Sequence, residues 1–261
     1  MRNSHGVGQL APEVRRDQLL ALLQRHGQLT VRAASEQLGV SAVTIRSDLA
    51  LLERDGRLRR VWGGATTVRP LWPEGSFAAR LKQHQAEKER IASAAAALIE
   101  DGDTIMLDAS TTAYAIARQI AAGRNLTVIT NGMHTALALG ASPTITTIVV
   151  GGVVRGETGS LAGTLAEEVL QRLHASKGFF SARGLTAAKG LTESSLAEGM
   201  LKAAMIRQVD MVIATLDSSK LGSNALTSFC PATSIRRLIT AGPEAEARSA
   251  EFRDLFEVMV V

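Results

Sequence analysis

Residues 30–65 read TVRAASEQLGVSAVTIRSDLALLERDGRLRRVWGGA. The pattern predicts a short helix over residues 31–38, a turn at Gly39 where a positive φ is favourable, and a second helix that begins after Ser41. The Ser41 hydroxyl suits an N-cap, because it can accept a hydrogen bond from a free backbone N–H of the next helix. This order places one short helix on a rigid support with its outer face free, an arrangement suited to the DNA major groove.

The second helix of this stretch has two different faces. Ile45, Leu49 and Leu52 recur at helical spacing and predict its buried stripe. The outward face carries Val43, Arg46, Ser47, Ala50 and Arg54, with Thr44 at its edge. Small hydroxyl side chains and an arginine suit base edges and flanking phosphates.

A basic hairpin, or wing, is predicted after this helix, where Arg57, Arg59 and Arg60 precede Gly63 and Gly64. The residues predicted to contact DNA in the helix and the wing are Ser41, Thr44, Arg46, Ser47, Arg54, Arg59 and Arg60. The alternative is an ordinary helical hairpin with a solvated charged face, since a helix-turn-helix pattern alone is a weak signal.

The charge distribution favours the DNA-binding interpretation. Residues 1–66 hold ten Lys and Arg against six Asp and Glu, whereas residues 67–261 hold nineteen of each. The whole net charge of +4 therefore lies in the first quarter of the chain. That distribution is expected when only this segment meets phosphate.

The N-terminal segment resembles the winged helix of DeoR-family transcriptional regulators. The resemblance is carried by Arg15, Leu19 and Leu23, by the S-x-x-T-I-R-x-D-L motif at 41–49, and by L-E-x-x-G-x-L-x-R-V-x-G-G-A at 52–65. One departure is Ser47, where the family usually carries arginine or another long polar residue. The resemblance implies double-stranded operator DNA as a partner, and Ser47 implies an altered half-site.

The chain has the length and composition of two domains. It contains 261 residues, of which 46% are apolar. We predict a winged helix-turn-helix domain at 11–66, a linker at 67–85 that contains Pro70, Pro73 and Gly75, and an α/β domain at 86–261.

A cytoplasmic location without a membrane anchor is expected from three features. Cys230 is the only cysteine, which excludes a disulfide framework and a cysteine-based metal site and fits a reducing compartment. The N-terminus lacks an apolar signal core. The uncharged run at 131–154 is interrupted by Asn131, His134 and Pro143, so it is interpreted as buried α/β core rather than a membrane span.

Short β-branched runs alternate with helical segments in the C-terminal part. Strands are predicted at 104–107, 126–130, 145–150, 178–181, 211–216, 237–240 and 258–261, with helices such as 112–122 and 133–139 between them. This alternation predicts a Rossmann-like, mostly parallel sheet with helices on both faces. The fold class is therefore α/β, with an N-terminal winged helix-turn-helix.

Polar residues follow the predicted strands, where ligands of such sheets bind. Hydroxyls and free N–H groups at the start of a helix form a natural anion site. A phosphorylated sugar is the predicted ligand, with phosphate near residues 110–112 and Lys220 and sugar hydroxyls near Asp108 and Asn131. The complete predicted set is Asp108, Ser110, Thr111, Thr112, Asn131, Gly151, Gly152 and Lys220. The alternative for each residue alone is a helix cap, a tight turn or a solvated lysine.

The resemblance to the DeoR family continues through this part, as its C-terminal sensor domain. It is carried by Phe77-x-x-Arg80, Glu87-Lys88, Asp101-Gly102-Asp103, Asp108-x-Ser110-Thr111-Thr112, Thr130-Asn131, Gly151-Gly152, Gly190-Leu191-Thr192, Lys202 and Asp217-x-Ser219-Lys220. The family's sensor domain is similar in fold to sugar-phosphate isomerases, and the resemblance implies a phosphorylated sugar effector that releases a repressor from its operator. Ala109, Ser176 and Ser181-Ala182 depart from the family pattern.

A sugar-phosphate isomerase or deaminase with an appended DNA-binding domain is the alternative function. Such an enzyme needs a carboxylate base beside the reacting atoms. The stretch 179–185 has no Asp or Glu, and the next carboxylate is Glu193. Glu193 or Asp217 can supply a base, although an exposed or capping role is the more ordinary one. We therefore predict a regulator without catalytic residues, cofactor or metal, since His134 and His174 form no metal motif.

The mechanism expected from the sequence is a symmetric homo-oligomer, a dimer or a tetramer, that places two winged helices on two half-sites. A sugar phosphate bound near residues 108–112 then shifts the oligomer between states that differ in affinity for the operator.

Overall fold

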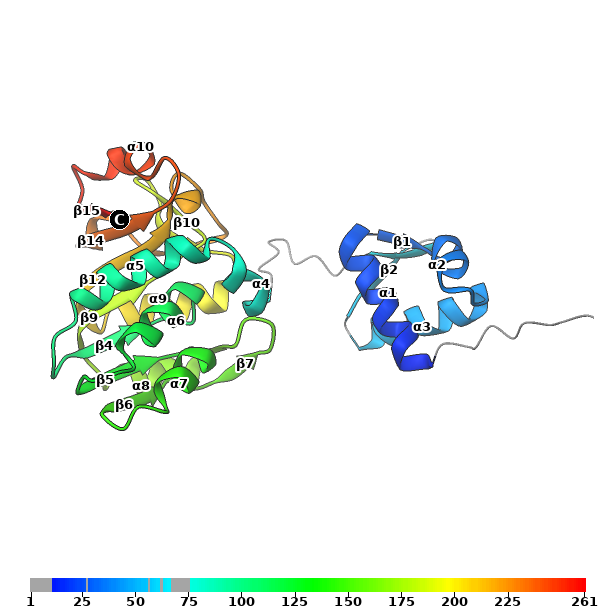
Figure 1. Ribbon diagram of the computed structural model, residues 1–261, viewed down its shortest axis with the longest axis horizontal. Coiled ribbons are helices and arrows are strands. Elements are labelled where there is room, and N and C mark those ends of the chain that lie inside the picture. The colour runs from blue at the N-terminus through cyan, green and yellow to red at the C-terminus, as the bar shows by residue number, and fades with distance from the viewer. Residues whose placement is uncertain (1–10, 27, 56, 62, 67–75) are drawn as a thin grey trace, which may run out of the picture. The chain divides into compact units, whose positions relative to one another are not determined.

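The computed structural model describes residues 11–26, 28–55, 57–61, 63–66 and 76–261, which form two compact units at Met1–Pro73 and Glu74–Val261 (Figure 1). The N-terminal unit contains three helices and three short strands among its described residues. They are α1 (Pro12–His26), β1 (Gln28–Thr30), α2 (Val31–Leu38), α3 (Ala42–Arg54), β2 (Arg59–Val61) and β3 (Gly64–Thr66).

The turn between α2 and α3 has the predicted chemistry. Gly39 adopts φ 65°, and the Ser41 hydroxyl accepts a hydrogen bond of 3.1 Å from the Thr44 backbone N–H. The strands form an antiparallel sheet in the order β1-β3-β2, so the predicted basic wing is the β2–β3 hairpin. The Arg60 backbone N–H donates to the Glu53 carboxylate at 2.8 Å, which joins the wing to the end of α3.

The core of the N-terminal unit is formed by the predicted stripe of α3. Ile45, Leu49 and Leu52 are at most 2% exposed and pack with leucines of α1. Beside them lies a buried ion pair, in which Arg15 of α1 donates to both Asp48 carboxylate oxygens, at 2.6 and 3.2 Å. Two helices are therefore joined by apolar packing and by one bidentate contact.

The C-terminal unit is built on a seven-stranded parallel sheet in the order β15-β14-β12-β9-β4-β5-β6. All seven predicted strands are confirmed with small shifts at their ends. They are β4 (Thr104–Leu107), β5 (Leu126–Thr130), β6 (Ile145–Val149), β9 (Ala175–Phe180), β12 (Val209–Asp217), β14 (Arg237–Ala241) and β15 (Glu257–Val260). The fold class is α/β, as predicted.

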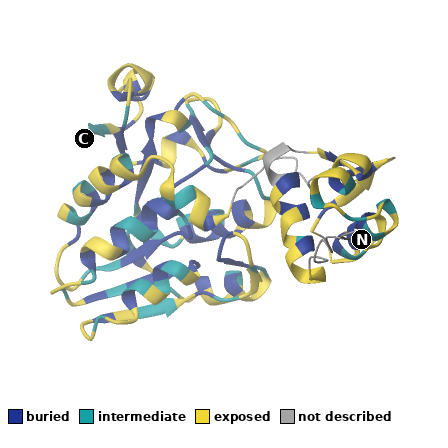
Figure 2. Cartoon of the chain, turned by 45° about the vertical axis from the view of Figure 1, so that its right-hand side comes forward, coloured by how far each residue is buried: buried dark blue, intermediate teal, exposed yellow. Residues whose placement is uncertain are grey.

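Helices cover both faces of this sheet. One apolar cluster joins it to α5 (Gln85–Ala97), α6 (Thr111–Ile120) and α7 (Met133–Leu139). The other joins the opposite face to α8 (Thr164–Leu170) and α9 (Leu196–Ile206). The sheet strands are mostly buried and the outer helix faces are exposed (Figure 2). This unit also contains the short elements η1 (Ser218–Lys220), η2 (Ala232–Ser234), α10 (Ala245–Ser249) and η3 (Ala250–Phe252).

Several short elements are absent from the sequence prediction. They are the hairpin β7 (Val153–Arg155) and β8 (Ser160–Ala162), the strands β10 (Gly184–Thr186), β11 (Gly190–Glu193) and β13 (Thr227–Cys230), and the helix α4 (Phe77–Lys82). The predicted linker, 67–85, thus contains a helix, while its residues 67–75 lie outside the described part. Within the described residues, no helix is long and apolar enough to cross a membrane, and the uncharged run at 131–154 covers α7 and β6.

The Asp48→Asn substitution should destabilise the N-terminal unit by about 3 kcal/mol, because it removes the negative charge that contacts the buried Arg15 guanidinium. Native-state hydrogen exchange of the α3 amides in the full-length chain measures this change. The Arg15→Met/Asp48→Leu double variant is the control, and it should be less destabilised than Asp48→Asn because it removes both charges. Wild-type protection of α3 in Asp48→Asn would contradict the prediction.

Candidate functional site

A cavity of about 120 Å³ opens at the carboxyl ends of β4, β9 and β12. The chain runs outward from β4 to β6 and then returns on the other side of β4 as β9, so the strand order reverses between β4 and β9. This is the position where parallel sheets of this kind bind ligands. The lining residues are Arg80, Gln83, His84, Lys88, Ser110, Thr111, Ser181, Ala182, Arg183, Glu193, Glu198, Lys202, Asp217, Ser219 and Lys220.

The loop between β4 and α6 forms one wall of the cavity. The Ser110 hydroxyl accepts a hydrogen bond of 3.0 Å from Ala113 N–H and so caps α6. The Asp108 carboxylate, which is fully buried, accepts from Ser110 N–H at 3.0 Å and from Ser181 N–H at 2.9 Å. Asp108 therefore fixes the loop after β4 against the loop after β9.

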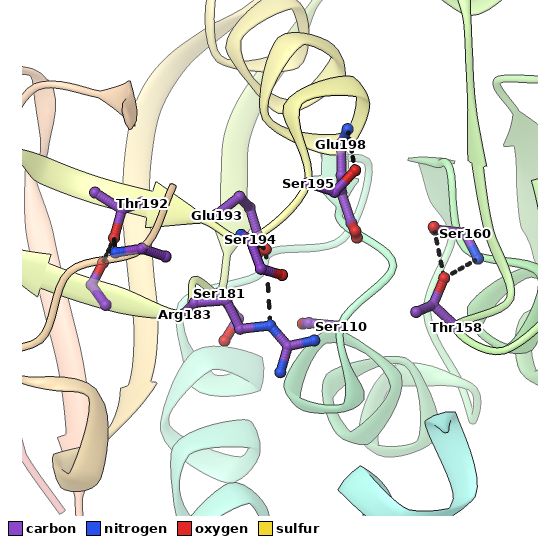
Figure 3. A network of polar contacts seen from close by, with 12 residues as sticks. Ser110, Thr158, Ser160, Ser181, Arg183, Thr192, Glu193, Ser194, Ser195 and Glu198 are labelled. Atoms are coloured by element: carbon purple, nitrogen blue, oxygen red, sulfur yellow. Dashed lines mark hydrogen bonds and ion pairs between the residues drawn. The ribbon is translucent and has the colours of Figure 1, made fainter. Parts of the chain in front are cut away.

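The Lys202 ammonium is the centre of a buried polar cluster beneath the cavity. Its Nζ lies 2.9 Å from Asp108 Oδ2 and 2.7 Å from Glu193 Oε1, and it donates to the Ser181 carbonyl at 2.8 Å. Burial lowers the pKa of Lys202, but the two carboxylates outweigh burial and hold the pKa above its ordinary value. Arg183 Nε lies 3.8 Å from the other Glu193 oxygen, Oε2, and the Arg183 side chain lies beside Ser181 (Figure 3).

Lys220 reaches the cavity from the end of β12. Its Nζ lies 3.4 Å from Asp217 Oδ2 and donates to the Ser181 hydroxyl at 3.1 Å. Burial and the Arg183 charge lower the pKa of Lys220, although Asp217 opposes them. Burial raises the pKa of Asp217, but Lys220 and the hydrogen bond from Ser219 hold it below its ordinary value.

Lys88 enters the cavity from α5 and is 4% exposed. Burial and the charge of Lys220 lower its pKa to about 8, while Asp217 partly offsets them. Counting all side chains that line the cavity, five lysines and arginines face three carboxylates. An anion is therefore the ligand whose charge this cavity complements.

The predicted effector residues divide into three groups. Ser110, Thr111 and Lys220 line the cavity, as expected. Asp108 and Thr112 are fully buried, and the Asp108 carboxylate is held by Ser110 N–H, Ser181 N–H and the Lys202 ammonium, so its position does not fit the expected contact with a sugar hydroxyl. Neither residue lines the cavity.

Asn131, Gly151 and Gly152 are the third group, and they do not line the cavity. The Asn131 side-chain N–H donates to the Leu161 carbonyl at 3.1 Å, and its backbone carbonyl accepts from Leu161 N–H at 2.8 Å. A side chain at Gly152 would meet the Ala162 carbonyl oxygen at 2.3 Å. Asn131 and Gly152 therefore hold the β7–β8 hairpin beside the ends of β5 and β6, and Gly151 begins the connection into it.

The lysines at 88 and 202 are cavity residues that the sequence prediction did not assign to the effector. The sequence feature that could have identified them is a lysine among the apolar residues of a helix. Lys88 lies one turn before Ile91 in α5, and Lys202 lies beside Leu201 in α9. Glu193 is 4% exposed and paired with Lys202, which corrects the expectation of an exposed carboxylate. Asp217 caps η1 by accepting a hydrogen bond from Ser219 N–H, which agrees with the capping role offered for it from the sequence.

The outward face of α3 has the predicted composition and exposure. Val43, Arg46, Ser47, Ala50 and Arg54 are exposed, and Thr44 is half-buried. Arg59 and Arg60 are exposed on the wing. Ser41 caps α3. At the other end of the helix, Arg54 Nε lies 4.0 Å from Oδ1 of the adjacent Asp55. The α3 face and the wing therefore present cations and small hydroxyls together to solvent.

Other candidate reactive residues have structural environments. His134 stacks on Phe77 with ring centroids 3.8 Å apart, and the exposed His174 lies 3.0 Å from Asp210. Cys230 is buried, and burial raises the pKa of its thiol to about 12. Among the described residues, no three His, Cys, Asp or Glu side chains are grouped closely enough to hold a metal ion.

Comparison with known proteins agrees with this two-unit arrangement. The DeoR-like helix-turn-helix domain matches residues 15–70, and the DeoR C terminal sensor domain matches residues 83–241. The chain is 36% identical to the HTH-type transcriptional regulator GolR of Listeria innocua, over 93% of this chain and 96% of that protein. It is 36% identical to the HTH-type transcriptional repressor GlcR of Bacillus subtilis, over 85% of each chain.

The chain is also similar to a repressor and, in structure, to an isomerase. The lactose phosphotransferase system repressor of Streptococcus mutans is 34% identical, over 87% of this chain and 91% of that protein. Ribose 5-phosphate isomerase A from Methanocaldococcus jannaschii aligns in structure with a TM-score of 0.40 and 14% identity, over 53% of this chain and 55% of that chain.

A winged helix-turn-helix joined to an α/β sensor domain defines a transcriptional regulator, in which the first unit implies DNA binding and the second implies effector binding. The chain belongs to the DeoR family of transcriptional regulators.

The Lys202→Met substitution should destabilise the C-terminal unit by about 4 kcal/mol at pH 8, because Asp108 and Glu193 are left buried without their cation. Urea unfolding of the wild type and the variant at pH 8 measures the loss. Wild-type stability in Lys202→Met would contradict the prediction.

Proposed function

We propose that this protein represses a carbohydrate catabolic operon and is released from its operator by a phosphorylated sugar. The observation that carries this proposal is the cavity at the reversal of strand order, where cations outnumber carboxylates. The names of the relatives support it, since a lactose phosphotransferase system repressor and a putative aga operon transcriptional repressor are among them. The protein is expected to act in the cytoplasm, where the operator DNA lies.

The phosphate is placed against Ser110, Thr111 and Lys220. The start of α6 offers N–H groups with partial positive charge, and Lys220 offers a full charge across the cavity. Sugar hydroxyls then face Arg183 and Glu198, which line the rest of the cavity in place of Asp108 and Asn131. Polar groups of both signs suit hydroxyls, which donate and accept hydrogen bonds.

The DNA is read by the exposed face of α3 and held by the wing. Thr44, Arg46 and Ser47 contact base edges or position the helix in the major groove, while Arg59 and Arg60 contact phosphates. Ser41 positions the first turn of α3, and Arg54 lies at its other end. A homo-oligomer, a dimer or a tetramer, presents two such helices to two half-sites.

A sugar-phosphate enzyme is the alternative function, and the environments of the carboxylates do not favour it. Glu193 is paired with Lys202 at 2.7 Å, and the Asp217 carboxylate lies 3.4 Å from Lys220. A carboxylate held by a cation is a weaker general base, because the cation lowers its affinity for a proton. We therefore propose that the cavity binds its ligand without turnover.

The Arg46→Ala variant should weaken operator binding by about 1–3 kcal/mol and leave effector binding unchanged, because Arg46 projects from the outward face of α3. Fluorescence anisotropy with a duplex selected by the full-length chain from a random library measures the loss. Arg118→Ala removes the same charge at an exposed position of α6, so it is the matched control and should bind like the wild type. Full operator affinity in Arg46→Ala would contradict this docking.

A thermal-shift screen of sugar phosphates should identify compounds that raise the unfolding transition, since a ligand of the native state stabilises it by mass action. Lys220→Met should remove this shift and the effector response while operator binding persists. Lys189→Met is the matched control, because Lys189 is exposed and outside the cavity. Turnover of a compound that binds would favour the enzyme, and an unchanged response in Lys220→Met would exclude this cavity as the effector site.

A further inference from the structure

The buried side chain of Lys88 helps to hold the corner between α4 and α5. The Lys88 ammonium donates hydrogen bonds to two backbone carbonyls, those of Arg80 and Gln83, at the end of α4. The last carbonyls of a helix have no partner within the helix and need one from outside it. Since α4 has only six residues, these two bonds complete a large part of its hydrogen bonding.

The backbone of the same corner is strained. His84, between α4 and α5, adopts φ 51° and ψ 42°, a left-handed conformation that is unfavourable for a residue with a side chain. Such a conformation persists only where surrounding contacts hold it. The bonds from Lys88 to the adjacent Gln83 and to Arg80 are contacts of this kind.

The other end of α4 is anchored independently of the cavity. The Phe77 backbone N–H donates to the Glu157 carbonyl at 2.8 Å, and the Phe77 ring packs against Tyr114 and His134. Loss of the Lys88 bonds would therefore free the cavity end of α4 and leave its Phe77 end in place.

Lys88 also faces the cavity and its charges. An ammonium has three N–H donors, and two of them are used on the carbonyls of α4. The charged groups around it are Lys220 and Asp217 from the end of β12, Arg80 from α4 and Glu87 from α5. An anion among these cations would attract the Lys88 ammonium, which has no carboxylate partner of its own within 4 Å among the described residues.

We propose that Lys88 binds the anionic group of the effector and also clamps the α4–α5 corner, so that anion binding draws the ammonium away from the Arg80 and Gln83 carbonyls and releases α4. This inference rests on the proposed function, because it takes the phosphate of the effector as the anion. Along the chain, α4 is the first described element after the winged helix, so the covalent path from the cavity to that unit passes through α4.

Lys220 provides a matched comparison within the same cavity. Its ammonium contacts the side chains of Asp217 and Ser181 and makes no hydrogen bond to α4. Both lysines are expected to bind the anion, but only Lys88 connects it to α4. Loss of Lys88 and loss of Lys220 should therefore weaken anion binding alike and affect the α4–α5 corner differently.

Hydrogen exchange of the full-length chain with and without inorganic phosphate tests the proposal. In the wild type, phosphate should slow exchange at residues 110–113 and speed exchange at residues 80–84. Lys88→Met should show the fast exchange at 80–84 without phosphate and should bind the selected duplex about tenfold more weakly than the wild type. Lys189→Met, at an exposed position outside the cavity, is the control and should keep wild-type exchange at 80–84 and wild-type duplex affinity. Lys220→Met should lose both phosphate effects.

Three results would overturn the proposal in distinguishable ways. Wild-type exchange at 80–84 in Lys88→Met would exclude the clamp, and circular dichroism verifies that this variant is folded. Slower exchange at 110–113 without a change at 80–84 in the wild type would exclude the coupling and leave the proposed effector site intact, even if Lys88→Met does not fold. No effect of phosphate at either segment would exclude the anion site and, with it, the proposed function.

Discussion

The contact of Lys202 with Asp108 and Glu193 is the interaction on which the effector-side architecture depends. These residues come from α9, from the end of β4 and from β11, and the Ser181 carbonyl adds the end of β9. Each carboxylate is almost inaccessible to water, so each must be paired to be tolerated. One ammonium therefore fixes three segments that are distant in sequence, and these segments form the floor of the cavity.

The same cluster determines the sign of the cavity's net charge. Asp108 and Glu193 are engaged by Lys202, and Asp217 is the carboxylate that acts most strongly on Lys88 and Lys220. Burial lowers the pKa values of both lysines, and a neighbouring cation lowers each further: Lys220 acts on Lys88, and Arg183 acts on Lys220. An anion that enters among these cations offsets their repulsion. The cluster thus gives the cavity a rigid floor and leaves an excess of positive charge at Lys88 and Lys220 above it.

The sheet could be predicted from the sequence because most of its strands are apolar runs with β-branched residues, whereas the residues that close the cavity could not. Strands β7, β8 and β10 have three residues each, too few for a recognisable alternation. The rule that ligands lie at strand ends selected Ser110 and Lys220 correctly as cavity residues, but it also selected Asn131. Asn131 instead contacts Leu161 of the β7–β8 hairpin, and this contact joins positions 30 residues apart.

Control of the winged helix has to act without unfolding it, because that unit has a separate apolar core and its own buried ion pair. The energy required is modest: coupling between two sites is typically about 1–3 kcal/mol. A hydrogen bond from a charged group contributes about 1.5–3 kcal/mol. The two bonds from Lys88 to the end of α4 therefore have the magnitude that regulation needs, and the strained His84 beside them gives the corner a reason to rearrange once they are lost.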